Sequence, residues 1–165
     1  MSRRDHEVRP TGGRFTDRGW YRRLDLIHGG RTFLRRRGLD LRWGGILVHR
    51  IDAADPGMDL HDHPWAFVSI VLRGGYTEEF CDTRLATGDL GERTWRRWSI
   101  HRMPLNIAHR ITAVEPNTVT LVLRTRKTRR WGFYLPTGWV DWEAYDYAQR
   151  RPVSVESDRP EERMP

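Results

Sequence analysis

The chain has 165 residues and a formal net charge of +7 at pH 7, and this length suits a single domain. Eight Trp, five Tyr and five Phe residues supply enough aromatic surface for a core, which excludes disorder throughout. No apolar run approaches the roughly 20 residues that span a bilayer, and no apolar stretch follows the N-terminus as in a secretory signal. Cys81 is the single cysteine, which excludes an internal disulfide framework. We therefore expect a cytoplasmic protein without a membrane segment.

The N-terminal region is predicted to be polar and partly helical. Residues 1–16 contain Pro10 and Gly12-Gly13 and indicate a disordered arm. Asp17 can cap a short helix that runs to Ile27, and residues 32–37 fit a further helical turn.

The middle of the chain is typical of a β-sandwich or barrel, because short strand-like stretches alternate with turns. Gly74-Gly75 predicts a hairpin between two of these stretches. Asp141 is predicted to cap a closing helix, and the polar residues 151–165 indicate a disordered tail. Residues 17–150 then form one domain. The stretches with strand character are 45–51, 66–73, 76–81, 94–103, 107–114, 118–126 and 131–135.

The histidines are the residues of this sequence that best indicate a functional site. His61 and His63 are two residues apart, and on a strand such residues point to the same face, so both can bind one metal ion. A third ligand must come from another strand, and His109 is the best candidate. Imidazole suits zinc, iron, copper and nickel alike. His49 fits a packed strand histidine better than a ligand.

Two segments resemble the motifs of the cupin superfamily: residues 61–75, HDHPWAFVSIVLRGG, and residues 104–109, PLNIAH. The resemblance covers roughly residues 44–125 and places His61, His63 and His109 on the three histidine ligands of the family. The HDHPW segment and the WGFYLPTGW ending are similar to a subgroup of small single-domain cupins. The resemblance implies an all-β, cupin-type double-stranded β-helix, or jelly-roll barrel, here with short flanking helices.

The sequence departs from the first cupin motif where the usual glutamate ligand would fall, because Val68 stands there. Two ligand sets stay open: three histidines with free positions, or the same histidines with a carboxylate from the next strand. If Val68 points inward, a two-residue turn at Gly74-Gly75 pairs Ile70 with Glu79, so Glu79 also points inward. Glu79 is then the candidate fourth ligand or catalytic base, and Glu78 faces solvent.

Three more residues are candidates for the site. His101 faces inward or outward depending on the length of the turn at Leu105-Asn106, and an inward His101 would be a supporting or catalytic group. Trp65 and Tyr76 are candidate walls of a substrate pocket. Both alternatives, pocket and plain core, stay open for these two aromatic side chains.

The leading functional interpretation is a metal-dependent enzyme, a non-haem Fe(II) oxygenase that acts on a small molecule. Its cofactor is one divalent ion, with Fe2+ favoured and Zn2+, Ni2+, Mn2+ or Cu2+ as alternatives. The other interpretations are a cupin isomerase or epimerase and a non-catalytic ligand- or nucleic-acid-binding cupin. We interpret the basic stretch 124–130 as solvated arginines on strand surfaces and not as a nucleic-acid-binding site. Cupins commonly dimerise, which makes a homodimer the default expectation.

Overall fold

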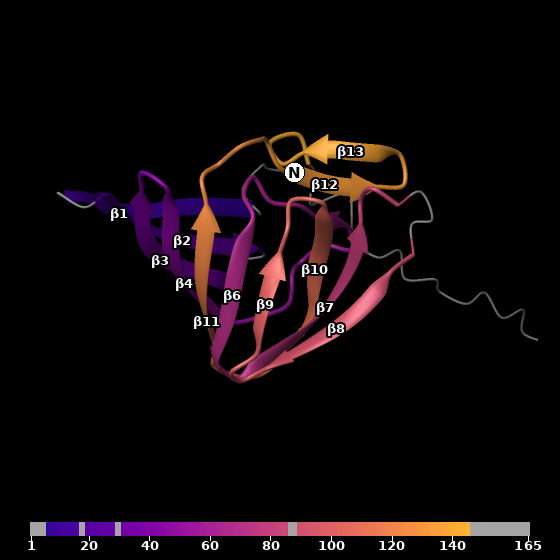
Figure 1. The fold of residues 1–165 in the computed structure, drawn as a ribbon, viewed down its shortest axis with the longest axis horizontal. Helices are drawn as coiled ribbons and strands as arrows, with labels where there is room; N and C mark the ends of the chain where they lie inside the picture. Colours follow the sequence, from indigo (N-terminus) through magenta and orange to yellow (C-terminus); the bar gives the residue numbers. More distant parts are fainter. Residues whose placement is uncertain (1–5, 17–18, 29–30, 86–88, 146–165) are drawn as a thin grey trace, which may run out of the picture.

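The computed structural model describes residues 6–16, 19–28, 31–85 and 89–145, and all regular secondary structure in them is β. The strands form two antiparallel sheets that face each other and enclose a barrel (Figure 1). The all-β class that the sequence predicts is therefore what the structure shows. Among the described residues there is no helix with the length and apolarity that a membrane span requires.

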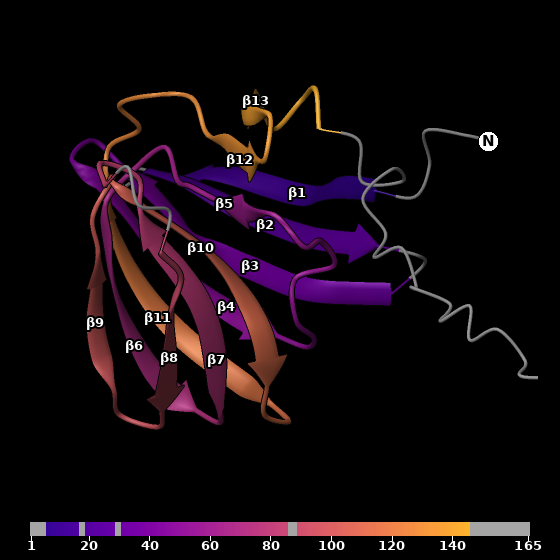
Figure 2. The same ribbon diagram turned by 90° about the vertical axis from the view of Figure 1, so that its right-hand side faces the viewer.

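The larger sheet has seven strands, and its N-terminal strands extend beyond the barrel (Figures 1 and 2). Strands far apart in the sequence meet at its centre, where β4 and β6 both pair with β11. In spatial order the strands are β1 (His6–Thr16), β2 (Gly19–His28), β3 (Arg31–Leu41), β4 (Gly44–Ile51), β11 (Thr118–Thr125), β6 (Phe67–Arg73) and β9 (Ile100–Met103).

The smaller sheet has six strands and carries the histidine motifs. Its strands β12 and β13 form a hairpin that lies across one end of the barrel (Figure 2). In spatial order the strands are β13 (Gly138–Asp141), β12 (Gly132–Leu135), β5 (Leu60–His61), β10 (Ile107–Val114), β7 (Gly75–Asp82) and β8 (Gly91–Arg96).

The predicted flanking helices are wrong where the structure describes those residues. The predicted first helix falls on β2, and residues 32–37 lie within β3. Leu24 and Leu26 flank Asp25 with the period of two that suits a strand, and hydrogen bonds to β1 and β3 satisfy the backbone on both sides. After Asp141 the described residues form a turn, and the rest of the predicted closing helix lies outside them.

Two further predictions concern the ends of the chain. Residues 6–16, expected to belong to a disordered arm, form β1 and pair with β2. Residues 1–5 and the predicted tail 151–165 lie outside the described residues.

The predicted hairpin at Gly74-Gly75 is a corner at which the chain passes from one sheet to the other. Strand β6 pairs with β9 and β11, whereas β7 pairs with β8 and β10. Gly74 has a φ of 66°, and a Cβ atom there would lie 2.4 Å from Oγ1 of Thr118. That hydroxyl also accepts a hydrogen bond from Gly75 N at 3.1 Å. The corner thus requires glycine at position 74, and no cross-strand pairing links β6 to β7.

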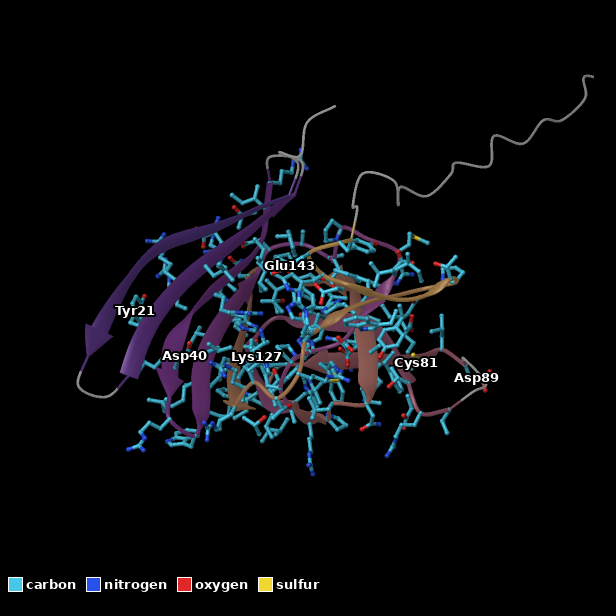
Figure 3. All side chains as sticks on the ribbon, turned by 90° about the horizontal axis from the view of Figure 1, so that it is seen from above. Tyr21, Asp40, Cys81, Asp89, Lys127 and Glu143 are labelled. Carbon is cyan, nitrogen blue, oxygen red and sulfur yellow. The ribbon has the colours of Figure 1, made fainter. Side chains whose placement is uncertain are left out.

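The interior between the sheets is filled by side chains of both polarities (Figure 3). Alternate residues of each strand point inward, so Val71 of β6 and Tyr76 of β7 meet Ile51 of β4 in one apolar cluster. Many buried side chains are nevertheless polar, and such groups need partners to be stable there. The buried polar residues are Asp62, Ser69, Glu78, His101, His109, Thr118 and Thr120.

Candidate metal centre

Three imidazoles converge inside the smaller sheet. His61 ends β5 and lies opposite His109 of β10 in the ladder, and His63 follows two residues after His61. The ring centroids form a nearly equilateral triangle, with separations of 5.1 Å between His61 and His63, 4.8 Å between His61 and His109, and 5.0 Å between His63 and His109. One nitrogen from each ring lies within 4.8 Å of the other two.

Two of these rings each have a carboxylate near their Nδ1 atom. Nδ1 of His109 donates to Oε2 of Glu78 at 2.5 Å. Nδ1 of His61 lies 3.8 Å from Oδ2 of Asp55, which also accepts a hydrogen bond from Ile111 N at 2.7 Å. The hydrogen bond to Glu78 fixes the orientation of the His109 ring and leaves its Nε2 available as the ligand atom.

Burial favours the neutral form of two of the three histidines, His61 and His63. Burial lowers the pKa of His61 to about 4, although the nearby Asp55 carboxylate opposes this shift. Burial, followed by the charges of the other two histidines, places the pKa of His63 well below its ordinary value. Neutral imidazole is the form that ligates metals, so no proton has to leave His61 or His63 near neutral pH.

The nitrogen positions fit a single divalent ion. Nε2 of His63 and Nε2 of His109 lie 2.8 Å apart. Two nitrogens bound to one ion at about 2.1 Å and at right angles to each other would lie about 3 Å apart. Close approach of two ring nitrogens is otherwise costly unless a proton or a cation lies between them. The three nitrogens are thus close enough together to hold one metal ion.

The predicted direction of Glu79 is wrong, and Glu78 is the buried carboxylate. Glu78 has no exposed surface, whereas Glu79 lies on the outer face with 27% of its side chain exposed and is bound by Arg110. The prediction assumed that Val68 points inward and that β6 pairs with β7. Instead Ser69 and Val71 are the buried residues of β6, and the corner at Gly74 removes the pairing.

Two hydrogen-bond donors, His109 and Trp95, and the cation Arg93 hold Glu78 as an anion. Trp95 Nε1 donates to Oε1 at 2.8 Å, and Nη2 of Arg93 lies 3.2 Å from the same oxygen. Burial raises the pKa of Glu78, but the hydrogen bond and charge of His109, with Trp95 and Arg93, outweigh it and lower the pKa to about 2. The direction of Glu78 depends on the corner at Gly74, and the loop residue Asp55 carries no local sequence signal, so sequence reasoning missed both.

His101 points inward, which decides between its two predicted orientations. Its side chain is buried and stacks on Trp95, with ring centroids 4.2 Å apart. Nε2 of His101 lies 3.1 Å from the hydroxyl of Tyr76. Nδ1 has no hydrogen-bond partner among the described residues. Burial lowers the pKa of His101 to about 4, despite the opposing charge of Glu78.

The two predicted pocket walls lie in different surroundings. Tyr76 is buried in the apolar cluster, and burial raises the pKa of its hydroxyl. Trp65 is partly buried beneath two guanidinium groups, with Arg124 Cζ 4.4 Å and Arg36 Cζ 6.0 Å from its ring centroid. His49 is a packed strand histidine, as its sequence context predicts, and Nε2 accepts a hydrogen bond from Nε of Arg36 at 3.0 Å.

Asp62 joins the histidine pair to the C-terminal hairpin. This residue lies between His61 and His63, is 1% exposed, and points away from the imidazoles. Its carboxylate accepts hydrogen bonds from the backbone N of Gly132 at 2.8 Å and from Nη2 of Arg129 at 2.8 Å. Further donors at 3.3 Å are the Tyr134 hydroxyl and Trp139 Nε1.

We expect Asp62→Asn to destabilise the fold by about 1–3 kcal/mol, because an amide cannot accept from all of these donors and leaves buried groups unsatisfied. Urea denaturation followed by fluorescence measures this change in the free energy of unfolding. Asp82→Asn is the control, since the Asp82 carboxylate binds the exposed Arg84 on the surface. Equal denaturation midpoints for Asp62→Asn and the wild type would contradict the structural role of Asp62.

The basic stretch 124–130 is largely paired with acidic groups. Arg124 binds Asp40, Arg129 binds Asp62, and Arg130 binds both Asp141 and Glu143. Acidic side chains thus pair with three of the five cations in this stretch.

Comparison with known proteins identifies solved structures with a similar fold. No family model and no curated protein matches the sequence. Solved structures do match, among them Streptomyces albus HEPD with 2-hydroxyethylphosphonate and Fe(II) bound, at 15% identity and a TM-score of 0.50 over 65% of this chain and 24% of that chain. FeII HppE matches at 15% identity and a TM-score of 0.49, over 72% and 66% of the two chains. Bacillus subtilis oxalate decarboxylase matches at 16% identity and a TM-score of 0.43, over 80% and 30%.

These identities establish a shared fold alone. The chain spans between about a quarter and two thirds of the length of these structures. The likeness to HEPD and the two facing antiparallel sheets confirm the cupin-type double-stranded β-helix, and residues 6–16, 19–28, 31–85 and 89–145 contain no flanking helix.

Proposed function

We propose that this cupin-fold chain binds one divalent metal ion through His61, His63 and His109 and is a metal-dependent enzyme acting on a small molecule. The observation that carries the proposal is the triangle of imidazoles, with Glu78 and Asp55 behind two of its rings. A catalytic metal site keeps positions open for reactants, and three protein ligands leave such positions. A bound divalent ion supplies Lewis acidity and, when it is iron, dioxygen chemistry.

Fe(II) is the ion that we favour, and an oxygenase is the activity. Three neutral imidazoles leave the charge of the ion uncompensated, and Glu79 is turned away on the outer face where it binds Arg110. HEPD carries Fe(II) in its solved structure, which supports iron as the first ion to test. The charge of Glu78 reaches the centre only through His109, whose orientation it fixes.

Within this proposal His101 is the group that holds or moves a proton near the centre. Its imidazole is neutral near pH 7, and its Nε2 meets the Tyr76 hydroxyl. Glu79 has no such role, since its carboxylate is bound by Arg110 outside the barrel. An isomerase would therefore have to use His101 in place of Glu79 as its base.

Nitric oxide tests whether an iron ion bound here has an open position. The metal-free chain is loaded anaerobically with one equivalent of Fe(II), and nitric oxide is added as a probe that resembles dioxygen. We expect the EPR signal of a high-spin iron–nitrosyl complex in the wild type and its loss in His63→Ala. Iron that binds fully but gives no nitrosyl signal would overturn the oxygenase proposal and indicate a closed, structural site.

A further inference from the structure

A pair of arginines lies on the inner face of the larger sheet, outside the histidine triangle. Arg36 of β3 is opposite His49 of β4, and Arg124 of β11 is opposite Gly45 of β4. Both guanidinium groups lie over the ring of Trp65. A Cβ atom at Gly45 would lie 2.9 Å from Cζ of Arg124, so the glycine makes room for this guanidinium.

The charges of this arginine pair are incompletely compensated. Asp40 binds Nη2 of Arg124, and Figure 3 shows Asp40 at the margin of the densely packed interior. Arg36 donates to neutral His49 and forms no ion pair with any carboxylate that the structure describes. Burial, followed by the charge of Arg124, lowers the pKa of Arg36 to about 10, although Asp40 opposes this shift, so the Arg36 guanidinium remains cationic at neutral pH.

A second observation points to a missing acceptor. The side chain of Arg124 is 9% exposed, and its Nε is buried without a hydrogen-bond partner among the described residues. Buried donors are nearly always satisfied, so such an atom calls for an acceptor. An anion placed between the two guanidiniums would supply acceptors to both and relieve their mutual repulsion.

The arginine pair adjoins the histidine triangle. Trp65, over which both guanidiniums lie, is two residues after His63. The charge of Arg36 also contributes to the lowered pKa of His63 and of His61. The short segment from His63 to Trp65 therefore links the arginine pair to the histidine triangle.

We propose that Arg36 and Arg124 form an anion-binding site, and that it holds a carboxylate or phosphate group of the substrate beside the metal centre. The assignment to a substrate rests on the proposed function, whereas the anion site itself does not. Arg36 is the principal anchor because it forms no ion pair with a described carboxylate, while Arg124 is already bound to Asp40.

Titration calorimetry on the full chain, with acetate and inorganic phosphate as separate probes at constant ionic strength, tests the proposal. We expect at least one anion to bind the wild type and Arg36→Gln to weaken that binding by about tenfold or more. Arg102→Gln is the matched control, because Arg102 is exposed on the outer face of β9 and the change in charge is the same. We expect this variant to bind within about twofold of the wild type.

Running each titration on metal-free and on Zn(II)-loaded protein separates the two proposals. Binding to the metal-free chain that depends on Arg36 supports the anion site even if no metal binds. Anion binding that appears only with zinc and is unchanged in Arg36→Gln overturns the site and leaves the metal centre intact. Failure of the wild type to bind either anion also overturns it.

A second measurement needs no variant. Phenylglyoxal modifies accessible arginines, and peptide mapping of the wild-type protein reports each position. We expect phosphate to slow the modification of Arg36 and to leave Arg102 unchanged. Equal rates at Arg36 with and without the better-binding anion would contradict the proposal, even if Arg36→Gln failed to fold.

Discussion

Replacing His63 with alanine is expected to lower metal affinity by more than about 100-fold. Removing a residue that only hydrogen-bonds to a ligand costs about 10–100-fold, and removing the ligand itself should cost more. The physical reason is that Nε2 of His63 lies 2.8 Å from Nε2 of His109, in the position of a neighbouring ligand. Competition with a chromogenic chelator measures the affinity for Zn(II) in each variant. His109→Ala should behave in the same way.

His49→Gln is the control for this pair of variants. His49 also points into the barrel, but it lies outside the cluster of three, and glutamine can still accept the hydrogen bond from Arg36. We expect full metal binding by His49→Gln. A loss of affinity in this variant as large as that in His63→Ala would show that the ligand set is not the one described.

Glu78→Gln is expected to weaken metal affinity by about 10–100-fold and to lower the free energy of unfolding by about 3–5 kcal/mol. The buried carboxylate is shared by His109, Trp95 and Arg93. A neutral amide leaves Arg93 without its counter-ion and presents N–H groups to other donors. Chelator competition and urea denaturation measure the two effects separately.

Glu79→Gln is the matched control on the same strand. The Glu79 carboxylate lies on the outer face and is bound to Arg110, so its loss should cost less than about 1 kcal/mol and leave metal affinity unchanged. If Glu79→Gln were the more damaging of the two, the orientation of β7 in this account would be reversed.

The sequence predicts the histidine cluster because its determinants are local. His61 and His63 are two residues apart, so extended backbone turns both to one side even though β5 ends at His61, and the motif around His109 supplies the partner. The inward carboxylate could not be predicted in the same way. Its direction depends on a corner at Gly74, where a tight turn joins two sheets, and Gly-Gly is equally typical of a hairpin within one sheet.

The N-terminal strands and the arginine pair depend on long-range pairing. Strand β2 is stabilised by hydrogen bonds to β1 and β3, and spacing of apolar residues alone fits a helix as well. Arg36 and Arg124 are 88 positions apart in the printed sequence. They meet because both β3 and β11 pair with β4, a register that no local pattern contains.

X-ray absorption at the zinc edge of the full chain loaded with one equivalent of Zn(II) tests the three-histidine centre most directly. We expect three imidazole nitrogens among the atoms bound to zinc, at about 2.0–2.2 Å, together with the scattering from the outer atoms of the imidazole rings. The same spectrum of His63→Ala should show fewer imidazoles or no specifically bound zinc. A wild-type shell of oxygen ligands without the imidazole signature would contradict the central claim.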